Sequence, residues 1–180
     1  HIVDFAGGYG KYGMPLLKMG FDVTIVDIHQ PSLDEARRRS DILPHGSGKL
    51  RTINTDVLRD GMPNFPDRVD GVLSIGFMHH LTNDAAQSLF EDMTDRLNSA
   101  GIAVIEFSTD KHRRMPDGTP ILVSGAPEHN LSYKEGLNFL KQLYENGQFT
   151  NIEYKTVTLK ERQINFWYDA KMIIACGIKK

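Results

Sequence analysis

Glycine residues directly follow the first apolar run of the chain, in the stretch DFAGGYG at residues 4–10. Residues 8–13 also satisfy the pattern GxGxxG. Glycines between a strand and a helix let the backbone turn tightly, and they let a ligand approach without meeting a Cβ atom. Ligands of open α/β sheets lie outside the carboxyl ends of the strands, so we expect one beside this loop. The alternative is a tight loop that binds nothing.

Two acidic residues end later predicted strands. Asp27 closes a run rich in β-branched residues, 19 residues after Gly8, and an acid at that place accepts hydrogen bonds from ribose hydroxyls. Asp56 could accept a hydrogen bond from an adenine amino group, while the N–H of Val57 reaches a ring nitrogen. The alternatives are a solvated carboxylate at Asp27 and a loop-capping one at Asp56. Together with the glycines, these acids predict a ligand that contains adenosine.

A third acid, Asp4, distinguishes two cofactors that contain adenosine. It precedes the glycines, where an extra carboxylate would repel the pyrophosphate of NAD but attract the ammonium and sulfonium groups of S-adenosylmethionine (SAM). The chain has no Tyr-x-x-x-Lys pair, and it ends in an aromatic-rich hairpin rather than a second substrate domain. These features favour SAM.

The elements that must position these residues alternate along the chain. Strand patterns occur at residues 1–6, 21–27, 49–55, 68–76 and 101–108. Helical patterns occur at residues 11–19, after a Ser32–Glu35 capping box, at 83–97 with Asn83 as the cap, and at 131–147. Residues 109–131 are predicted to be a long polar loop, and residues 150–159 and 164–178 a final hairpin. This order predicts one α/β domain over residues 1–180, with a doubly wound, mostly parallel sheet and helices on both faces.

The motifs also follow the order of a known family, and the chain resembles the class I (Rossmann-like) SAM-dependent methyltransferases over nearly its whole length. The matching stretches are DFAGGYG (4–10), VTIVD (23–27), NTDVL (54–58), VDGVLSIGFMHHL (69–81) and LNSAGIAVIEFS (97–108). The resemblance implies a seven-stranded sheet of order 3-2-1-4-5-7-6 with an antiparallel last strand. The chain departs from the family at Ala6, where the first glycine is usual.

The resemblance further implies how SAM is bound. Gly8 and Gly10 would pass beneath its methionine part, Asp4 would lie near its ammonium group, and Asp27 would bind the ribose. The cofactor-binding residues predicted in this way are Asp4, Ala6, Gly7, Gly8, Gly10, Asp27, Ile28, Asp56, Val57, Ile75 and Gly76.

Two histidines, His79 and His80, follow the fourth predicted strand and are candidate catalytic residues. Neutral imidazole is a suitable general base at pH 7 if the methyl acceptor has to lose a proton. The alternative is a structural turn in which the rings cap a helix or pack.

A basic cluster of Lys111, Arg113 and Arg114 opens the predicted loop 109–131. It could bind the carboxylate or phosphate of an anionic acceptor, and Tyr133 is a further candidate for the acceptor site. The alternative is a solvated basic turn.

Composition excludes several other classes. The net charge of −2 and an isoelectric point near 6.4 argue against a dedicated nucleic-acid binder. No stretch approaches the ~18 apolar residues of a membrane span, and without a signal peptide we expect a cytoplasmic protein. The single cysteine, Cys176, excludes an internal disulfide and a zinc site of several thiolates, and we predict no metal. Because His1 already opens a strand pattern, we expect that an N-terminal segment is missing. The resemblance to the methyltransferases implies that part of the acceptor site lies in that segment.

We therefore predict an enzyme that transfers a methyl group from SAM to a small-molecule acceptor. The alternatives are a fragment of an NAD(P)-dependent oxidoreductase and a non-catalytic domain of a larger protein that binds SAM or a partner. The sequence does not indicate an oligomeric state.

Overall fold

A single seven-stranded sheet organises the chain, in a computed structural model that describes residues 1–65, 68–121 and 130–180. Its order is β3-β2-β1-β4-β5-β7-β6, as predicted. Strands β1 to β5 pair in parallel, whereas β7 runs antiparallel to both β5 and β6. The strands are β1 (Ile2–Phe5), β2 (Val23–Asp27), β3 (Leu50–Asn54), β4 (Val69–Ser74), β5 (Leu97–Arg114), β6 (Phe149–Arg162) and β7 (Trp167–Lys179).

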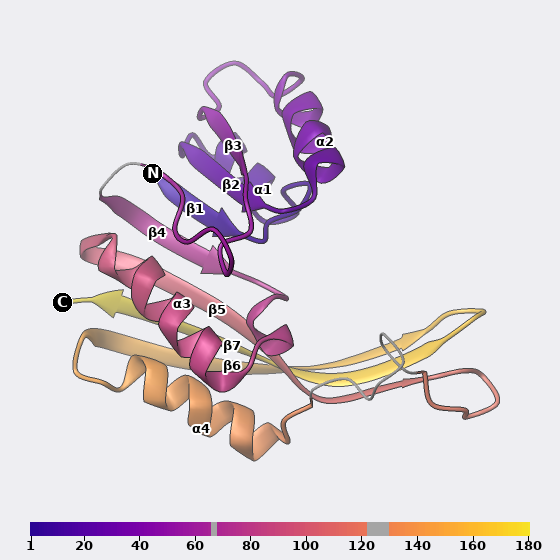
Figure 1. Cartoon of the computed structure of the whole chain (residues 1–180). Coiled ribbons are helices and arrows are strands. Elements are labelled where there is room, and N and C mark those ends of the chain that lie inside the picture. The colour runs from indigo at the N-terminus through magenta and orange to yellow at the C-terminus, as the bar shows by residue number, and fades with distance from the viewer. Residues whose placement is uncertain (66–67, 122–129) are drawn as a thin grey trace.

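Helices cover both faces of this sheet (Figure 1). They are α1 (Gly13–Lys18), α2 (Gln30–Ser40), α3 (Asn83–Asp95) and α4 (Tyr133–Tyr144), with a short 3₁₀ turn at Met78–His80. Alternate residues of a strand point to opposite faces, so Val23 and Ile25 pack beneath α1 and α2 while Val26 joins the core beneath α3 and α4. The prediction of a doubly wound α/β sheet is confirmed.

The core beneath α3 and α4 is aromatic. Tyr144 of α4 is fully buried against Phe90 and Phe149. Its hydroxyl donates to the carbonyl oxygens of Ala103 and Ala175, on two neighbouring strands. Burial raises the pKa of Tyr144 well above its ordinary value, so the hydroxyl stays a neutral donor and joins α4 to the sheet.

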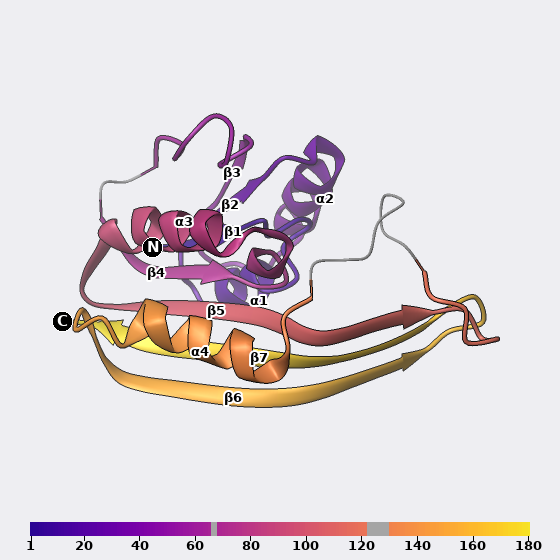
Figure 2. The same cartoon turned by 60° about the horizontal axis from the view of Figure 1, so that its bottom comes forward.

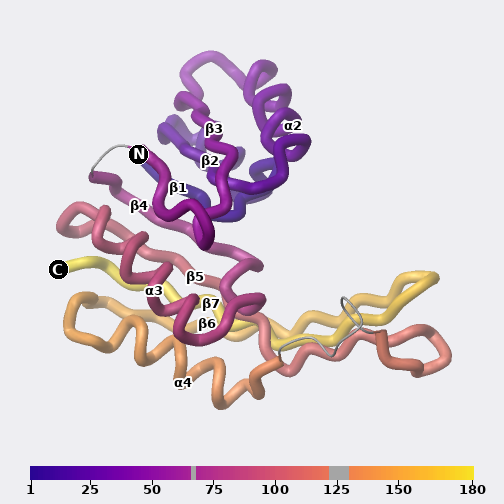
Figure 3. Tube along the Cα trace, in the orientation of Figure 1, coloured from indigo at the N-terminus to yellow at the C-terminus, as the bar shows by residue number. Residues whose placement is uncertain are grey.

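The predicted loop at 109–131 is partly wrong, because β5 continues to Arg114. Pairing with β4 ends at Ile105, but β7 continues to pair with β5 as far as Arg114. Polar residues fit there because the buried Thr109 and Lys111 donate hydrogen bonds to carbonyl oxygens, whereas the side chains from His112 to Arg114 keep access to water. Residues 109–114, 158–162 and 167–171 thus form a three-stranded ribbon, which projects away from the end of the sheet that carries both termini (Figure 3).

Two predicted helix starts are also wrong. Helix α2 begins at Gln30, and the Ser32 hydroxyl pairs with the His29 ring instead of forming a capping box. Helix α3 is capped by Thr82, not Asn83, because the Thr82 hydroxyl accepts a hydrogen bond from the N–H of Ala85. The caps move from Ser32 to His29 and from Asn83 to Thr82, by three residues and by one, and the order of elements is unchanged.

Candidate functional site

The glycine loop joins β1 to α1 at the carboxyl edge of the sheet. Ala6, Gly8 and Gly10 have φ values of 54°, 54° and 82°, a left-handed backbone that glycine adopts without strain. A Cβ atom at Gly7 would lie 2.7 Å from Cγ of Asp4. The loop therefore folds tightly over the Asp4 carboxyl group, and glycine at position 7 is required for that packing.

Asp4 is 1% exposed beneath this loop. Burial raises its pKa to about 7, against the opposing effect of a hydrogen bond from the Gly13 N–H. Among the described residues, Oδ2 has no hydrogen-bond partner. A buried acceptor that lacks a donor is costly, so a ligand that brings a cation or an N–H group to this point would be favoured.

Asp27, at the end of β2, is held in a defined orientation. Its Oδ2 accepts a hydrogen bond from the N–H of Gly8 at 2.8 Å, and its Oδ1 accepts one from the N–H of His29 at 2.8 Å. Each carboxylate oxygen has two lone pairs, so both can still accept a hydroxyl from a ligand. The contact with Gly8 joins this acid directly to the glycine loop.

Asp56 follows β3 and caps its own turn, as the alternative interpretation of this residue expected. Its Oδ1 accepts from the N–H groups of Leu58 at 3.1 Å and Arg59 at 3.3 Å. Capping occupies one carboxylate oxygen and leaves Oδ2 for a ligand. The two interpretations of Asp56 are therefore compatible.

Two adjacent cavities bring most of the predicted cofactor residues together. A cavity of about 320 Å³ is lined by Ala6, Val26, Asp27, Ile28, Thr55, Asp56, Val57, Leu58 and Phe77. A second, of about 210 Å³, is lined by Asp4, Ala6, Gly7, Gly8, Tyr9, Lys11, Tyr12 and Ile75. Ala6 lies at the wall common to both. The first has apolar surfaces for a base and a carboxylate for a ribose, and the second has the Asp4 carboxyl and the Lys11 ammonium, which suit an amino acid.

Glu106, on β5, is a buried acid beside this site that the sequence did not single out. It is 1% exposed, and its Oε1 accepts a hydrogen bond from the Ser108 hydroxyl at 2.8 Å. A Cβ atom at Gly76, which has a φ of 76°, would lie 3.7 Å from its Oε2. Burial raises the pKa of Glu106, while Ser108, the Gly76 N–H and the ammonium groups of Lys111 and Lys11 act against that rise.

The two histidines lie in different surroundings. His79 is 6% exposed, and its Nδ1 accepts a hydrogen bond from the N–H of Ser108 at 3.4 Å. Burial lowers the pKa of His79 to about 3, helped by the charges of His80, Lys111 and Arg113. A neutral ring whose Nδ1 accepts must carry its proton on Nε2, so His79 can donate a hydrogen bond but is a poor proton acceptor. His80 is exposed and stacks on His79, with ring centroids 4.2 Å apart.

The predicted basic cluster is divided by the alternation of β5. Lys111 is buried, and its Nζ donates to the carbonyl of His79 at 3.5 Å. The Arg113 guanidinium lies over the Tyr168 ring, 4.9 Å from its centroid. Arg114 points to the other face and pairs with Asp169 at 2.7 Å. The cluster is therefore not a solvated turn, and only Lys111 and Arg113 share the face that carries Glu106.

Tyr133 lies apart from these residues. It begins α4, and its hydroxyl pairs with the Thr156 hydroxyl of β6 at 3.1 Å. The Lys171 ammonium lies 5.2 Å from its ring centroid. Residues 122–129 of the predicted loop 109–131 lie outside the described residues.

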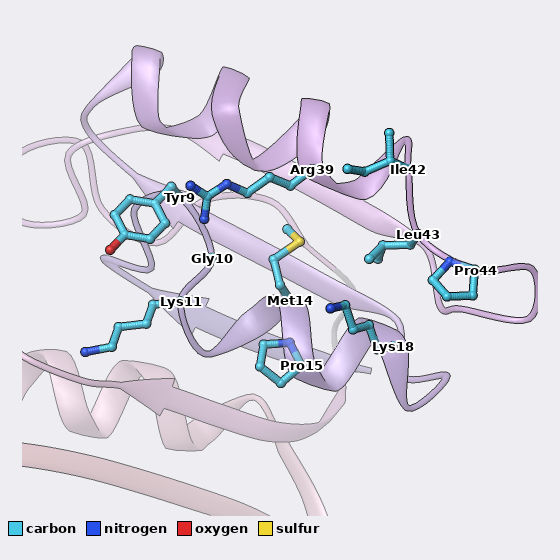
Figure 4. Close-up of a pocket in the computed structure, with 10 residues that line it drawn as sticks. All are labelled: Tyr9, Gly10, Lys11, Met14, Pro15, Lys18, Arg39, Ile42, Leu43 and Pro44. Carbon is cyan, nitrogen blue, oxygen red and sulfur yellow. The ribbon is translucent and has the colours of Figure 1, made fainter.

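A larger cavity, of about 560 Å³, lies between α1 and α2 (Figure 4). Its lining combines apolar side chains with three cations and no acid: Tyr9, Gly10, Lys11, Met14, Pro15, Lys18, Arg39, Ile42, Leu43 and Pro44. It shares Tyr9 and Lys11 with the 210 Å³ cavity but contains neither Asp4 nor Asp27. This cavity therefore lacks the acidic residues that the sequence predicts to bind the cofactor.

A match to a family model identifies the family of this chain. The family model described as "Methyltransferase domain" matches residues 2–101, more than half of the chain. The chain belongs to this methyltransferase family. A search of curated proteins gives no match. SAM is the cofactor, and the matched segment contains the glycine loop, Asp27, Asp56 and Gly76.

Solved methyltransferase structures share the fold. A SAM-dependent methyltransferase from Methanosarcina mazei has a TM-score of 0.69 at 16% identity, over 99% of this chain and 92% of that one. TehB from Haemophilus influenzae has a TM-score of 0.67 at 20% identity, over 99% and 57% of the two chains. Magnesium protoporphyrin IX methyltransferase from Synechocystis, crystallised with SAM, has a TM-score of 0.63 at 14% identity, over 99% and 69%.

Two other features, a metal-binding cluster and a membrane-spanning helix, are absent from the described residues. Within residues 1–65, 68–121 and 130–180, no group of three or more His, Cys, Asp or Glu side chains is placed to hold a metal ion. In the same part of the methyltransferase, no helix is long and apolar enough to cross a bilayer.

Proposed function

We propose that this methyltransferase binds SAM across the two adjacent cavities and methylates a small-molecule acceptor beside Glu106. The observation that carries the proposal is the arrangement around Ala6. A cavity suited to adenosine and a cavity suited to an amino acid meet there, and Glu106 lies behind Gly76 at the next strand. SAM supplies an electrophilic methyl group at the junction of these two parts.

The cofactor residues divide by the part of SAM that they would bind. Asp27 accepts the ribose hydroxyls, and Ile28 and Val57 contact the adenine, whose amino group donates to Asp56. The backbone of Gly7, Gly8 and Gly10 borders the methionine part together with that of Ile75 and Gly76. Asp4 receives the ammonium group, which satisfies its otherwise unpaired Oδ2.

The acceptor side combines a proton acceptor with cations. An acceptor hydroxyl or amine would take the methyl group as the bond between that carbon and the sulfonium sulfur breaks, with the neutral thioether of S-adenosylhomocysteine as the leaving group. The proton of the acceptor would pass to the ionised Glu106 carboxylate. A raised pKa suits that role, because a general base works best with a pKa near the operating pH. Lys111 and Arg113 lie on the same face and would attract a negative charge on the acceptor. His79 instead orients the turn after β4 through Ser108.

Titration calorimetry with SAM and with NAD tests the cofactor. We expect SAM to bind and NAD not to bind, and an Asp27→Asn variant to bind SAM more weakly. Binding of NAD with no response to SAM would support the oxidoreductase alternative.

Transfer of labelled methyl groups from SAM to the low-molecular-weight fraction of a cell extract tests the acceptor. Label that remains in SAM, despite tight binding, would support a non-catalytic domain. Label found only in nucleic acid or protein would contradict the small-molecule acceptor.

A further inference from the structure

Strand β6 forms one edge of the sheet and is unusually long. It spans 14 residues, Phe149–Arg162, whereas strands typically have ~5–6 residues. Among the described residues it pairs with β7 alone, and Figure 2 shows no element on its outer side. An edge strand exposes a row of unpaired N–H and C=O groups that can pair with another chain. This edge can therefore pair with a strand of another chain.

The hairpin geometry shows which backbone groups point outward. The Gln163 N–H donates to the Phe166 carbonyl at 2.9 Å, so these residues form a hydrogen-bonded pair. Such pairs alternate along antiparallel strands, and in this register the odd-numbered residues from 153 to 161 bond to β7. The N–H and C=O groups of residues 154, 156, 158, 160 and 162 consequently face the open edge. No backbone hydrogen bond from another described segment reaches them.

The side chains of β6 also differ between its two faces. Tyr154 and Thr156 contact the end and the start of α4, through Glu145 and Tyr133. From Glu153 onwards, beyond the register shift in the pairing of β6 with β7, the odd-numbered residues lie on the opposite face, where Val157 is 41% exposed.

Three charged residues on that open face, Glu153, Lys155 and Glu161, have no ion-pair partner in the described part of the chain. Lys155 and Glu161 are of opposite sign and lie six residues apart on one face of one strand. Both could be paired by an antiparallel partner strand of the same sequence.

Self-pairing of β6 is possible in only a few registers. Residues directly opposite in an antiparallel pair share a face, so a two-fold axis must pass through one residue. An axis at Thr158 places Lys155 opposite Glu161 of the second copy, twice, and Val157 opposite Leu159. These are non-hydrogen-bonded pairs, in which side chains approach most closely. Opposite charges and apolar pairs at such positions stabilise a sheet.

Neighbouring axes do not give this match. An axis at Val157 places Glu153 opposite Glu161. An axis at Lys155 or at Lys160 places that lysine opposite itself. An axis at Thr156 or Leu159 leaves all three charges of the open face without an oppositely charged partner. An axis at Tyr154 places Glu153 opposite Lys155 but leaves Glu161 opposite a residue outside β6.

We propose that two copies of this chain pair through their β6 edges, antiparallel, with the two-fold axis at Thr158. The outward N–H and C=O groups of residues 154, 156, 158, 160 and 162 in each copy would form about ten hydrogen bonds between the two strands. The two sheets then become one continuous sheet. The cofactor cavities lie near β1 and β2, at the other side of the sheet, and stay open in this dimer.

Charge reversal tests the register. We expect the parent chain to sediment as a dimer that dissociates on dilution. Lys155→Glu and Glu161→Lys should each give a monomer, and the double variant should restore the dimer. Lys134→Glu, an equal charge change on an exposed residue of α4, is the matched control and should leave the dimer intact. A parent chain that is monomeric at every concentration would overturn the proposal, and so would a dimer that both single variants leave unchanged.

Cysteine cross-linking tests the axis, in a Cys176→Ser background. Opposed residues of a hydrogen-bonded pair have Cα atoms ~5.5 Å apart, a separation that a disulfide spans. Thr158→Cys should therefore give an oxidised dimer. Thr156→Cys is the matched control, because it would lie about 14 Å from its own copy at ~3.4 Å per residue, and it should stay uncross-linked. Equal cross-linking of the two variants, or cross-linking of Thr156→Cys alone, would overturn the assigned register.

Discussion

Replacing Asp4 by Asn should change how the stability of the methyltransferase depends on pH. The pKa of Asp4 is about 7 in the folded chain and 3.8 in the unfolded chain. Between these values the unfolded chain ionises while the folded chain keeps its proton, so the folded state loses stability as the pH rises from about 4 to about 7. One pKa unit corresponds to ~1.4 kcal/mol. The difference therefore amounts to about 4 kcal/mol above pH 7.

Urea unfolding of the parent and of Asp4→Asn, at a series of pH values from 4 to 8, measures this contribution. An asparagine cannot ionise, so the free energy of unfolding of the variant should fall less over this range. The difference between the two curves should grow by up to about 4 kcal/mol as the pH rises. Parallel curves would refute the reasoning, because they would show that Asp4 ionises as readily in the folded chain as in the unfolded one.

The same residue should couple SAM binding to proton release. The ammonium group of SAM favours the ionised carboxylate, so below pH 7 binding should release a proton that calorimetry detects in buffers of different ionisation enthalpy. Asp4→Asn should bind SAM about 10-fold to 100-fold more weakly, the scale of a hydrogen bond to a charged group. It should also release no proton. Equal proton release by parent and variant would assign the effect to another residue.

Three further substitutions test individual residues. Asp27→Asn should raise the Kd for SAM by about 10-fold to 100-fold with little change in thermal stability, since one charged acceptor is lost; an unchanged Kd in calorimetry would remove Asp27 from the site. Gly7→Ala should lower the free energy of unfolding by ~1–3 kcal/mol in urea, because its Cβ would lie 2.7 Å from Asp4, and equal stability would contradict the packing of the loop. Glu106→Gln should lower kcat by about 10²-fold or more and abolish the acid limb of the pH–rate profile. An intact profile, with SAM affinity equal to the parent's, would show that another group takes the proton.

The order of strands and helices could be predicted because it depends on local patterns. Alternating apolar runs, separated by glycines, indicate a parallel sheet with crossover helices. Asp27 and Asp56 could be placed because each ends a strand at the edge where ligands bind. The structure brings them to one cavity, as this topology requires.

The missed features depend on contacts between distant parts of the chain. Residues 109–114 are polar and show no strand pattern by themselves, and they become a strand because β7 pairs with them. Glu106 lies within an apolar run, and only the turn after β4 shows that its carboxyl group faces Gly76. The separation of Arg114 from Lys111 likewise follows from the alternation of a strand that was expected to be a loop.

A crystal structure with S-adenosylhomocysteine bound would test the assigned cofactor site most directly. We expect the ribose hydroxyls within ~3.2 Å of the Asp27 carboxylate, the adenine in the cavity lined by Ile28 and Val57, and the amino group at Asp4 Oδ2. The sulfur should point towards Glu106. Product bound in the cavity between α1 and α2, with the cavities on either side of Ala6 empty, would contradict the assignment.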